Sequence, residues 1–333
     1  MFVSKYIKRL FLNNLKQSFL LPLFFYSLFS FGQNFDSVDA TARQFSSHIN
    51  SAQELASTIS KNYATDINKV RALYIYLTNN IAYDLNDYKY GANNYSFSYS
   101  SKKELEEKIR KRDLEVIQRT LSSKKAICEG YSMVYKEVCD ILNIKCEIIS
   151  GYSRTVSSTI GVFPIEERHA WNAVYINSQW NLIDTTWGAG YSKDANHWIQ
   201  SFDANYFFTK PEVLIASHYP EDKNWQLLNT PLSKAQFCTQ PIFSSLFFQE
   251  KIELISPKSG ILRGNNKYLI VQLKNVKPDI EFGYAFEKDF YLTSIIPEFK
   301  NKKAILKIPI TGKRNTTLNI LSGTEMILQY KIE

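Results

Sequence analysis

Apolar and polar positions divide the chain into a helical first part, a mixed middle and a β-rich end. Between Asp66 and Thr78 apolar residues recur at the three- and four-residue spacing of one helix face, and Asp66 is a suitable N-cap. Residues 88–100 are rich in Tyr, Asn, Ser and Gly, which is typical of a loop. Residues 101–121 are charged, follow a helical pattern and begin with the spacing of a capping box, so they predict a second long helix.

The middle of the chain predicts one helix followed by strands. The helix covers residues 126–142, and the strands cover 144–152, 169–176 and 180–186. The last two strands are separated by Asn177-Ser178-Gln179, a short polar turn that is typical of a hairpin. This order indicates an α+β domain in which a helix precedes an antiparallel sheet.

The hairpin register decides which side chains share a face. If the turn falls on Asn177-Ser178, His169 opposes Thr186, and Asp184 is the diagonal neighbour of His169 on the same face. A four-residue loop gives the same parity, whereas a three-residue loop places His169 and Asp184 on opposite faces. The two-residue turn therefore predicts that imidazole and carboxylate meet.

Beyond residue 245 helical periodicity is absent and short β-rich runs alternate with Gly, Pro, Asn and Lys. The runs are 252–255, 267–273, 282–286, 304–310 and 317–321. Short strands with frequent turn signals predict a small all-β sandwich. We therefore expect a first domain over residues 33–244 and an accessory β domain over residues 245–333.

The N-terminus has the pattern of an export signal. Four basic residues and no acidic ones occur before Asp36, and the apolar run of residues 19–32 is short and interrupted by Pro22. We expect residues 1–32 to be a signal peptide cleaved between Gly32 and Gln33, with an uncleaved N-terminal anchor as the alternative. The mature chain would be periplasmic, cell-surface or secreted, with membrane contact only through export.

Charge and cysteine content exclude several classes. The formal charge is +8, and removal of the four basic residues of the signal leaves about +4. No basic cluster alternates with aromatic residues, so we expect no nucleic-acid partner. The cysteines at 128, 139, 146 and 238 match neither a disulfide framework nor a zinc motif; Cys139 and Cys146 fit buried apolar positions.

Cys128 is the candidate nucleophile. It lies where a loop enters the helix, and the free amides and helix dipole there favour the reactive thiolate form. Gly130 would keep the first turn open for a substrate. With His169 as base and Asp184 behind it, the three residues fit thiol acyl transfer. A structural cysteine and a stabilising His–Asp pair are the alternatives.

Three ordered motifs are similar to the transglutaminase-like superfamily, and most similar to its kyphoscoliosis-peptidase branch. They are Cys128-Glu-Gly-Tyr-Ser, His169-Ala-Trp-Asn and Asp184-Thr-Thr-Trp-Gly. Flanking pieces that support the resemblance are Ile81-Ala-Tyr-Asp, Tyr206-Phe-Phe-Thr-Lys-Pro, His218-Tyr-Pro and Trp225-Gln-Leu-Leu. The resemblance covers about residues 65–240. It implies a papain-like α+β core with Cys128 as nucleophile, His169 as general base and Asp184 as orienting acid.

The chain departs from this resemblance at the oxyanion site. Transglutaminases proper have a Trp upstream of the nucleophile, whereas the first Trp here is Trp171. The Cys128 amide and the Tyr83 hydroxyl are candidate oxyanion donors, with Tyr83 as a plain core aromatic the alternative. Trp171 is a candidate wall of the core or cleft. His197 and His218 are interpreted as structural or surface residues.

These patterns predict an exported cysteine-dependent enzyme that cleaves peptide or carboxamide bonds through a thioester. A peptidase or deamidase is favoured over a crosslinking transamidase, since the resemblance is to a peptidase branch. The substrate would be a protein or peptide, or else a cell-envelope polymer. We expect no cofactor and no metal; a zinc site of Cys128 and His169 would lack a fourth ligand. The alternative is a non-catalytic surface binding or scaffold protein with the same fold.

Overall fold

The computed structural model describes residues 34–333 except 92–95 and 264–266. The predicted signal peptide and its cleavage point at Gly32-Gln33 lie outside the described residues. Phe35–Glu333 form one compact unit. Among the described residues, none of the helices combines the length and the apolar character that a membrane span requires.

The first part of the chain is helical, as its spacing predicts. Its long helices are α2 (Ala52–Asn62), α3 (Asp66–Asn80), α5 (Lys102–Ser123) and α6 (Cys128–Ile141), and its short ones are α1 (Asp36–Ala42) and α4 (Leu85–Tyr90). The predicted helix from Asp66 is confirmed as α3, but its N-cap is Thr65, so Asp66 is the first helical residue instead. Every residue of α3 from Val70 to Thr78 is buried, because the helix is surrounded by α1, α2, α6 and α7 (Thr185–Ala189).

A five-stranded antiparallel sheet lies against α6. Its order is β8-β5-β4-β3-β9, formed by Phe207–Thr209, Gln179–Ile183, Arg168–Ile176, Cys146–Ser153 and His218–Pro220. Helix α6 contacts both β3 and β4. The antiparallel sheet with the Cys128 helix packed on it is the α+β core that the sequence predicts.

The β4–β5 hairpin turns through Asn177 and Ser178, as predicted. Both residues have left-handed backbone angles, with φ of 53° and 62°, which is the geometry of a type I′ turn. Ile176 opposes Gln179, as expected. The predicted pairing of His169 with Thr186 is wrong, because the β4–β5 ladder stops at Asn172 and Ile183 and Thr186 lies in α7.

Two small ladders flank the core. Strand β2 (Lys125–Ala126) comes directly before α6 in the chain, and β1 (Ala82–Tyr83) pairs with it in parallel. Strands β6 (Gly190–Asp194) and β7 (His197–Gln200) follow α7. The remaining short helices of this part are η1 (Ser157–Thr159), η2 (Ala204–Tyr206), α8 (Pro211–Leu214), η3 (Lys223–Gln226) and α9 (Lys234–Cys238).

Gly130 does not open the first turn of α6 to a substrate, contrary to the expectation from the sequence. It is buried and faces α5. A Cβ at this position would lie 2.5 Å from Thr120 Oγ1 and 2.7 Å from Ala126 Cβ. The glycine therefore allows the close approach of α5 and the β2 segment to α6.

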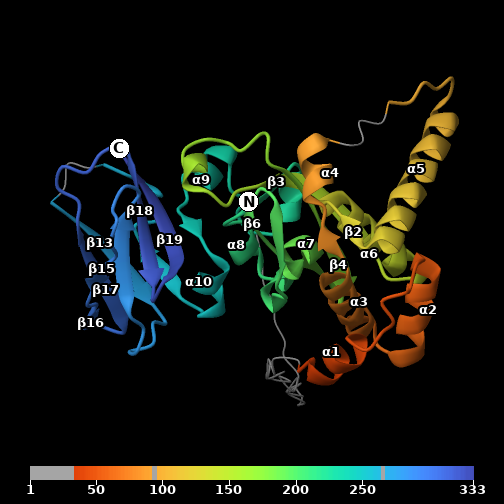
Figure 1. Cartoon of the computed structure of the whole chain (residues 1–333), viewed down its shortest axis with the longest axis horizontal. Helices are drawn as coiled ribbons and strands as arrows, with labels where there is room; N and C mark the ends of the chain where they lie inside the picture. Colours follow the sequence, from red (N-terminus) through yellow and green to blue (C-terminus); the bar gives the residue numbers. More distant parts are fainter. Residues whose placement is uncertain (1–33, 92–95, 264–266) are drawn as a thin grey trace, which may run out of the picture. The chain divides into compact units, whose positions relative to one another are not determined.

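The end of the chain forms β-sheets, as predicted, together with one short helix, and its strands are coloured blue in Figure 1. Its two sheets have the orders β10-β19-β18-β14-β15, with β12 beside β19, and β11-β13-β17-β16. These strands are Ile242–Phe243, Glu253–Ser256, Ile261–Leu262, Tyr268–Lys274, Phe282–Phe286, Thr293–Ile295, Glu298–Lys300, Lys303–Pro309, Thr316–Ser322 and Glu325–Ile332, numbered β10 to β19 in chain order. Helix α10 (Ser245–Gln249) joins them.

The β-rich end has its own hydrophobic core. This core runs from Phe247 to Ile332 and shares no residue with the cluster around α3 and α6. Sheet pairing begins at Ile242, just before the predicted boundary after residue 244. The division into domains at this point stays a prediction.

Candidate active site

Cys128 is the first residue of α6 and is partly exposed. The N-cap residue is Ile127, which has no side chain that can accept a hydrogen bond, so no cap covers the first amides of the helix. The β1–β2 ladder fixes the chain immediately before this point, since Tyr83 pairs with Ala126. The thiol therefore stands at the positive end of a 14-residue helix.

His169 lies near the start of β4 and is 7 % exposed. It pairs with Gly151 of β3. Three residues further along β4, the buried Asn172 donates from Nδ2 to the Ser132 carbonyl of α6 at 3.1 Å. This bond fixes the strand that carries the imidazole against the helix that carries the thiol.

Asp184 follows β5 and is fully buried. Its Oδ1 accepts from the amides of Thr186 at 2.8 Å and Trp187 at 2.9 Å, so the carboxylate is the N-cap of α7. Its Oδ2 lies 2.6 Å from His169 Nε2, a distance typical of a charge-assisted hydrogen bond. The backbone amide of Asp184 donates to the Tyr206 carbonyl at 2.9 Å. The carboxylate is thus held on both sides.

The structure brings Cys128, His169 and Asp184 together. His169 is hydrogen-bonded to Asp184, and Cys128 is close enough to contribute to the raised pKa of His169. Because Nε2 faces the carboxylate, Nδ1 is the nitrogen left for the thiol. The resulting order is thiol, imidazole and carboxylate.

The charges of the site favour a protonated imidazole. Burial lowers the pKa of His169, but the Asp184 charge and the hydrogen bonds to Asp184 and Cys128 outweigh it and raise this pKa to about 10. For Asp184, burial raises the pKa, and the charge of His169 together with the bonds from His169 and His218 brings it well below its usual range. Asp184 is therefore ionised and His169 positively charged at neutral pH.

His218 is the residue that the sequence interpretation missed. It lies in β9, is 1 % exposed, and its Nε2 lies 2.9 Å from the same Asp184 Oδ2 that contacts His169. Its position in the motif His218-Tyr-Pro was the one available signal. His197, by contrast, has an exposed side chain and pairs with Asp194 on β6, as a surface residue would.

Aromatic side chains enclose the histidines. The Trp171 ring stacks on His169, with centroids 5.9 Å apart and planes at 24°, and is itself buried. Trp187 lies 5.9 Å from His169 and 4.4 Å from His218. These rings keep water away from the imidazole–carboxylate pair, which strengthens its electrostatic interaction.

Tyr83 lies close enough to Cys128 to be influenced by it. Its ring stacks on Trp198 with centroids 5.5 Å apart. Burial, followed by the nearby Cys128, raises the pKa of Tyr83, so its hydroxyl stays protonated and able to donate.

The remaining cysteines are buried and free. Cys139, Cys146 and Cys238 are all buried thiols, whereas Cys128 is partly exposed. Burial also raises the pKa of Cys139 and of Cys238. Of the four thiols, Cys128 is therefore the accessible one.

The polar atoms of His169, Asp184 and His218 lie within 4.8 Å of one another, which is close enough to be tested as a metal site. Two ligands of one zinc ion are about 3.3 Å apart at tetrahedral geometry. The His169–Asp184 distance of 2.6 Å is shorter than that and fits a shared proton. The group is therefore described better by hydrogen bonds than by coordination.

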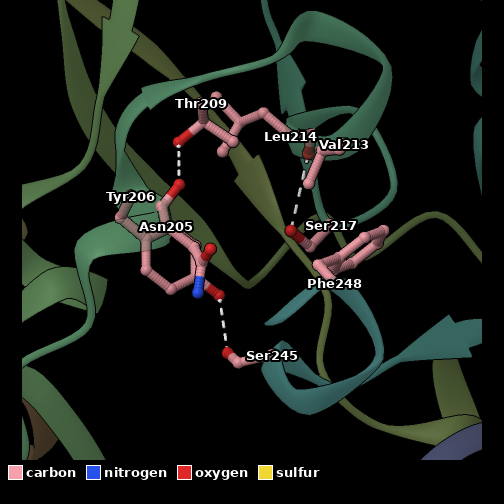
Figure 2. A pocket seen from close by; sticks show the side chains of 8 residues that line it. All are labelled: Asn205, Tyr206, Thr209, Val213, Leu214, Ser217, Ser245 and Phe248. Carbon is pink, nitrogen blue, oxygen red and sulfur yellow. Dashed lines mark hydrogen bonds between the residues drawn. The ribbon is translucent and has the colours of Figure 1, made fainter. Parts of the chain in front are cut away.

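A small pocket of about 20 Å³ includes Ser217, the chain neighbour of His218, in its lining (Figure 2). It is lined by Asn205, Tyr206, Thr209, Val213, Leu214, Ser217, Ser245 and Phe248. The hydroxyls of Tyr206 and Ser245 meet across it at 3.1 Å. Ser217 connects it to the site, because Ser217 Oγ lies 2.8 Å from His218 Nδ1.

Comparisons with known proteins place part of the chain in a family. Residues 53–185 match the family model of the transglutaminase-like superfamily. The chain is similar to the kyphoscoliosis peptidases of Mus musculus and Homo sapiens, each 28% identical over 74% of this chain. These alignments span 34% and 35% of the two relatives, about a third of their length. A solved structure, the periplasmic domain of TgpA from Pseudomonas aeruginosa, is 16% identical over 45% of this chain and 49% of that chain, with a TM-score of 0.27.

Proposed function

Because the chain carries a domain of the transglutaminase-like superfamily over residues 53–185, we propose that it is a cysteine-dependent acyl-transfer enzyme that acts on peptide or carboxamide bonds. The observation that carries the proposal is the position of the His169 imidazole, whose Nε2 lies 2.6 Å from Asp184 Oδ2 and which is close enough to Cys128 for that residue to raise its pKa. Nucleophile, base and orienting acid in this order are the arrangement that thiol acyl transfer needs.

The proposed reaction starts from an ionised Asp184, a protonated His169 and the thiolate form of Cys128. The Cys128 thiolate attacks the carbonyl carbon of the substrate, and the oxygen takes up the negative charge. The C–N bond then breaks while His169 gives its Nδ1 proton to the departing nitrogen, which leaves a thioester on Cys128. Water then attacks the thioester and gives a proton to His169. The carboxylic acid product leaves, and protonated His169 and the Cys128 thiolate are regenerated.

Two donors near Cys128 would bind the developing oxyanion. The backbone amide of Cys128 is at the uncapped start of α6, and the Tyr83 hydroxyl remains protonated beside it. Preorganised donors of this kind stabilise the tetrahedral intermediate more than the ground state.

Hydrolysis is the proposed outcome, with transfer to an amine as the competing one. The relatives with the longest alignments given above are named peptidases, which supports water as the acceptor. The substrate would be a protein, a peptide or a cell-envelope polymer, and we propose that the protein meets it after export. Cell fractionation with N-terminal sequencing of the purified protein would test export and cleavage at Gly32-Gln33.

The activity is tested by alkylation and by substrate turnover. Iodoacetamide should label Cys128 at a lower pH than Cys139, Cys146 and Cys238, and Cys128→Ser should abolish that early labelling. Incubation with a mixed library of amides should release ammonia or a free amine, or give a crosslinked mass. Equal, slow labelling of all four cysteines together with no turnover would favour the non-catalytic scaffold instead.

A further inference from the structure

Two histidines from different strands share one carboxylate oxygen. His169 of β4 and His218 of β9 both place Nε2 on Asp184 Oδ2, at 2.6 and 2.9 Å. Strand β9 reaches this point by pairing with β3 on the side away from β4, with His218 opposite Ser153. Together with the two amides on Oδ1, all four acceptor positions of the carboxylate are occupied.

The contacts of His218 define its tautomer. An ionised carboxylate only accepts hydrogen bonds, so Nε2 of His218 carries a proton. Burial is the largest influence on His218 and lowers its pKa, so the ring is neutral and Nδ1 is bare. Ser217 Oγ lies 2.8 Å from Nδ1 and 3.4 Å from its other acceptor, the Leu214 carbonyl, so the shorter contact is the one in which the serine donates to Nδ1. Ser217 and Asp184 thus select the same tautomer from opposite sides of the ring.

His218 is not placed to act on the thiol itself. Its Nε2 is taken by Asp184, its Nδ1 by Ser217, and the Trp187 and Trp171 rings lie 4.4 and 5.2 Å from its ring. The titratable groups that face it are Asp184, His169 and Tyr206. Its effect on the reaction must therefore pass through the carboxylate.

We propose that His218 is a positioning residue. Ser217 holds it as its Nε2–H tautomer, and in this form it fixes the Asp184 oxygen that is hydrogen-bonded to His169. The inference rests on the proposed function. With a second donor on Oδ2, the carboxylate cannot rotate away from His169. The second donor also shares the negative charge, so Asp184 holds the His169 proton less tightly, and this proton must move to the leaving group.

The pocket in Figure 2 allows the serine to be tested separately from the histidine. Ser217 lines the pocket, so Ser217→Ala enlarges an existing space and leaves the His218 ring and its bond to Asp184 in place. His218→Leu removes the donor while keeping an apolar side chain. His218→Gln restores an N–H donor of similar reach, and its recovery of activity would separate positioning from packing.

The first experiment reads the tautomer directly. Nitrogen NMR of the full-length chain labelled with ¹⁵N-histidine should show His218 with Nε2 protonated and Nδ1 unprotonated from pH 6 to 8. Ser217→Ala should add the second tautomer or broaden the signals. A wild-type His218 with the proton on Nδ1, or a doubly protonated ring at pH 7, would overturn the proposal.

The second experiment measures the consequence for Cys128. The iodoacetamide rate of Cys128 between pH 5 and 9 should fall about 10- to 100-fold at pH 7 in His218→Leu, and His218→Gln should recover most of it. Thermal melts of each variant show whether the fold persists. A folded His218→Leu chain with the wild-type rate and pH profile, or a folded His218→Gln chain as slow as His218→Leu, refutes the positioning role.

The two levels of proposal can fail separately. If wild-type Cys128 labels no faster than the buried cysteines and no amide is turned over, the proposed enzyme function fails. The tautomer of His218 would still be measurable in that case and would then describe a structural hydrogen bond only. If turnover is present but independent of the residue at 218, the function stands and the positioning role is wrong.

Discussion

Replacing Asp184 by Asn tests the site most directly, because the change removes one charge and preserves the shape of the side chain. The carbonyl oxygen of Asn can still accept from the Thr186 and Trp187 amides, so the cap of α7 survives. The NH₂ group then replaces Oδ2 and points two protons at the Nε2 atoms of His169 and His218, which were donors. Nε2 of His169 must then give up its proton to accept from the amide, so the ring becomes neutral with its one proton on Nδ1 and no longer supplies the positive charge that stabilises the Cys128 thiolate.

The size of the effect follows from the bonds lost. Loss of the orienting carboxylate from a nucleophile–histidine–acid triad lowers turnover by about 10⁴-fold, or about 5.5 kcal/mol of transition-state stabilisation. Two of the four bonds to the buried carboxylate are also lost, so we expect a loss of about 3 kcal/mol in the free energy of unfolding. The pKa of His169 should fall, because the Asp184 charge is the largest influence that raises it and burial acts in the opposite direction.

The assay measures two quantities in each variant. The first is the alkylation rate of Cys128 as a function of pH, read by peptide mass mapping, and the second is turnover of the best amide found in the library. Asp194→Asn is the matched control. Asp194 also pairs with a histidine, His197, at 2.8 Å, but on the exposed surface. The control should keep both the wild-type rate profile and the turnover, since a surface pair contributes little.

Wild-type rates in a folded Asp184→Asn chain would refute the reasoning. So would an equal loss in the Asp194→Asn control, because that would show a general response to charge removal. Rescue of Asp184→Asn by added imidazole would be informative in the other direction, since it would locate the defect in the base and not in substrate binding.

Three further outcomes are expected. Tyr83→Phe should lower kcat by about 10²- to 10³-fold with little change in stability, because it removes one oxyanion donor and keeps the stack on Trp198; an unchanged kcat would assign Tyr83 to the core alone. Gly130→Ala should cost about 1–3 kcal/mol in urea unfolding, since its Cβ would meet Thr120 at 2.5 Å, and a neutral effect would contradict the packing. The free energy of unfolding should fall as pH rises from 6.5 to about 10, because folded His169 keeps a proton that the unfolded chain releases; His169→Gln should flatten that slope, measured by urea titration at each pH.

The fold of the core and the place of Cys128 at the start of a helix could be predicted because their signals are local. Asn177-Ser178 specifies the turn of the β4–β5 hairpin, and the helix after Cys128 has a regular apolar face. Each signal lies within about fifteen residues, where periodicity and turn chemistry determine the conformation. Gly130 was misread because the sequence does not show that α5, which ends a few residues earlier, packs against it.

The meeting of His169 and Asp184 was predicted, but the geometry behind it was not. The expected diagonal pair required the ladder to continue to Thr186. Instead β5 ends at Ile183, and the Asp184 side chain caps a five-residue helix that is too short to leave a periodic pattern. The carboxylate therefore reaches the imidazole from a strand end, and capping, not strand register, sets its direction.

His218 shows where sequence reasoning reaches its limit. It lies 34 residues after Asp184, and the strand that carries it is three residues long, too short for alternation to mark an inward face. What places it is the pairing of β9 with β3, on the opposite side of β3 from β4, together with the approach of Trp187 and Trp171. A buried imidazole in such surroundings is stable only if both nitrogens are satisfied, and the partners that satisfy them are Asp184 and Ser217. The need to satisfy both nitrogens therefore directs the Nε2–H of His218 at Asp184, the carboxylate on which the proposed reaction depends. No local sequence pattern could show this, because both partners are brought to the ring by tertiary packing.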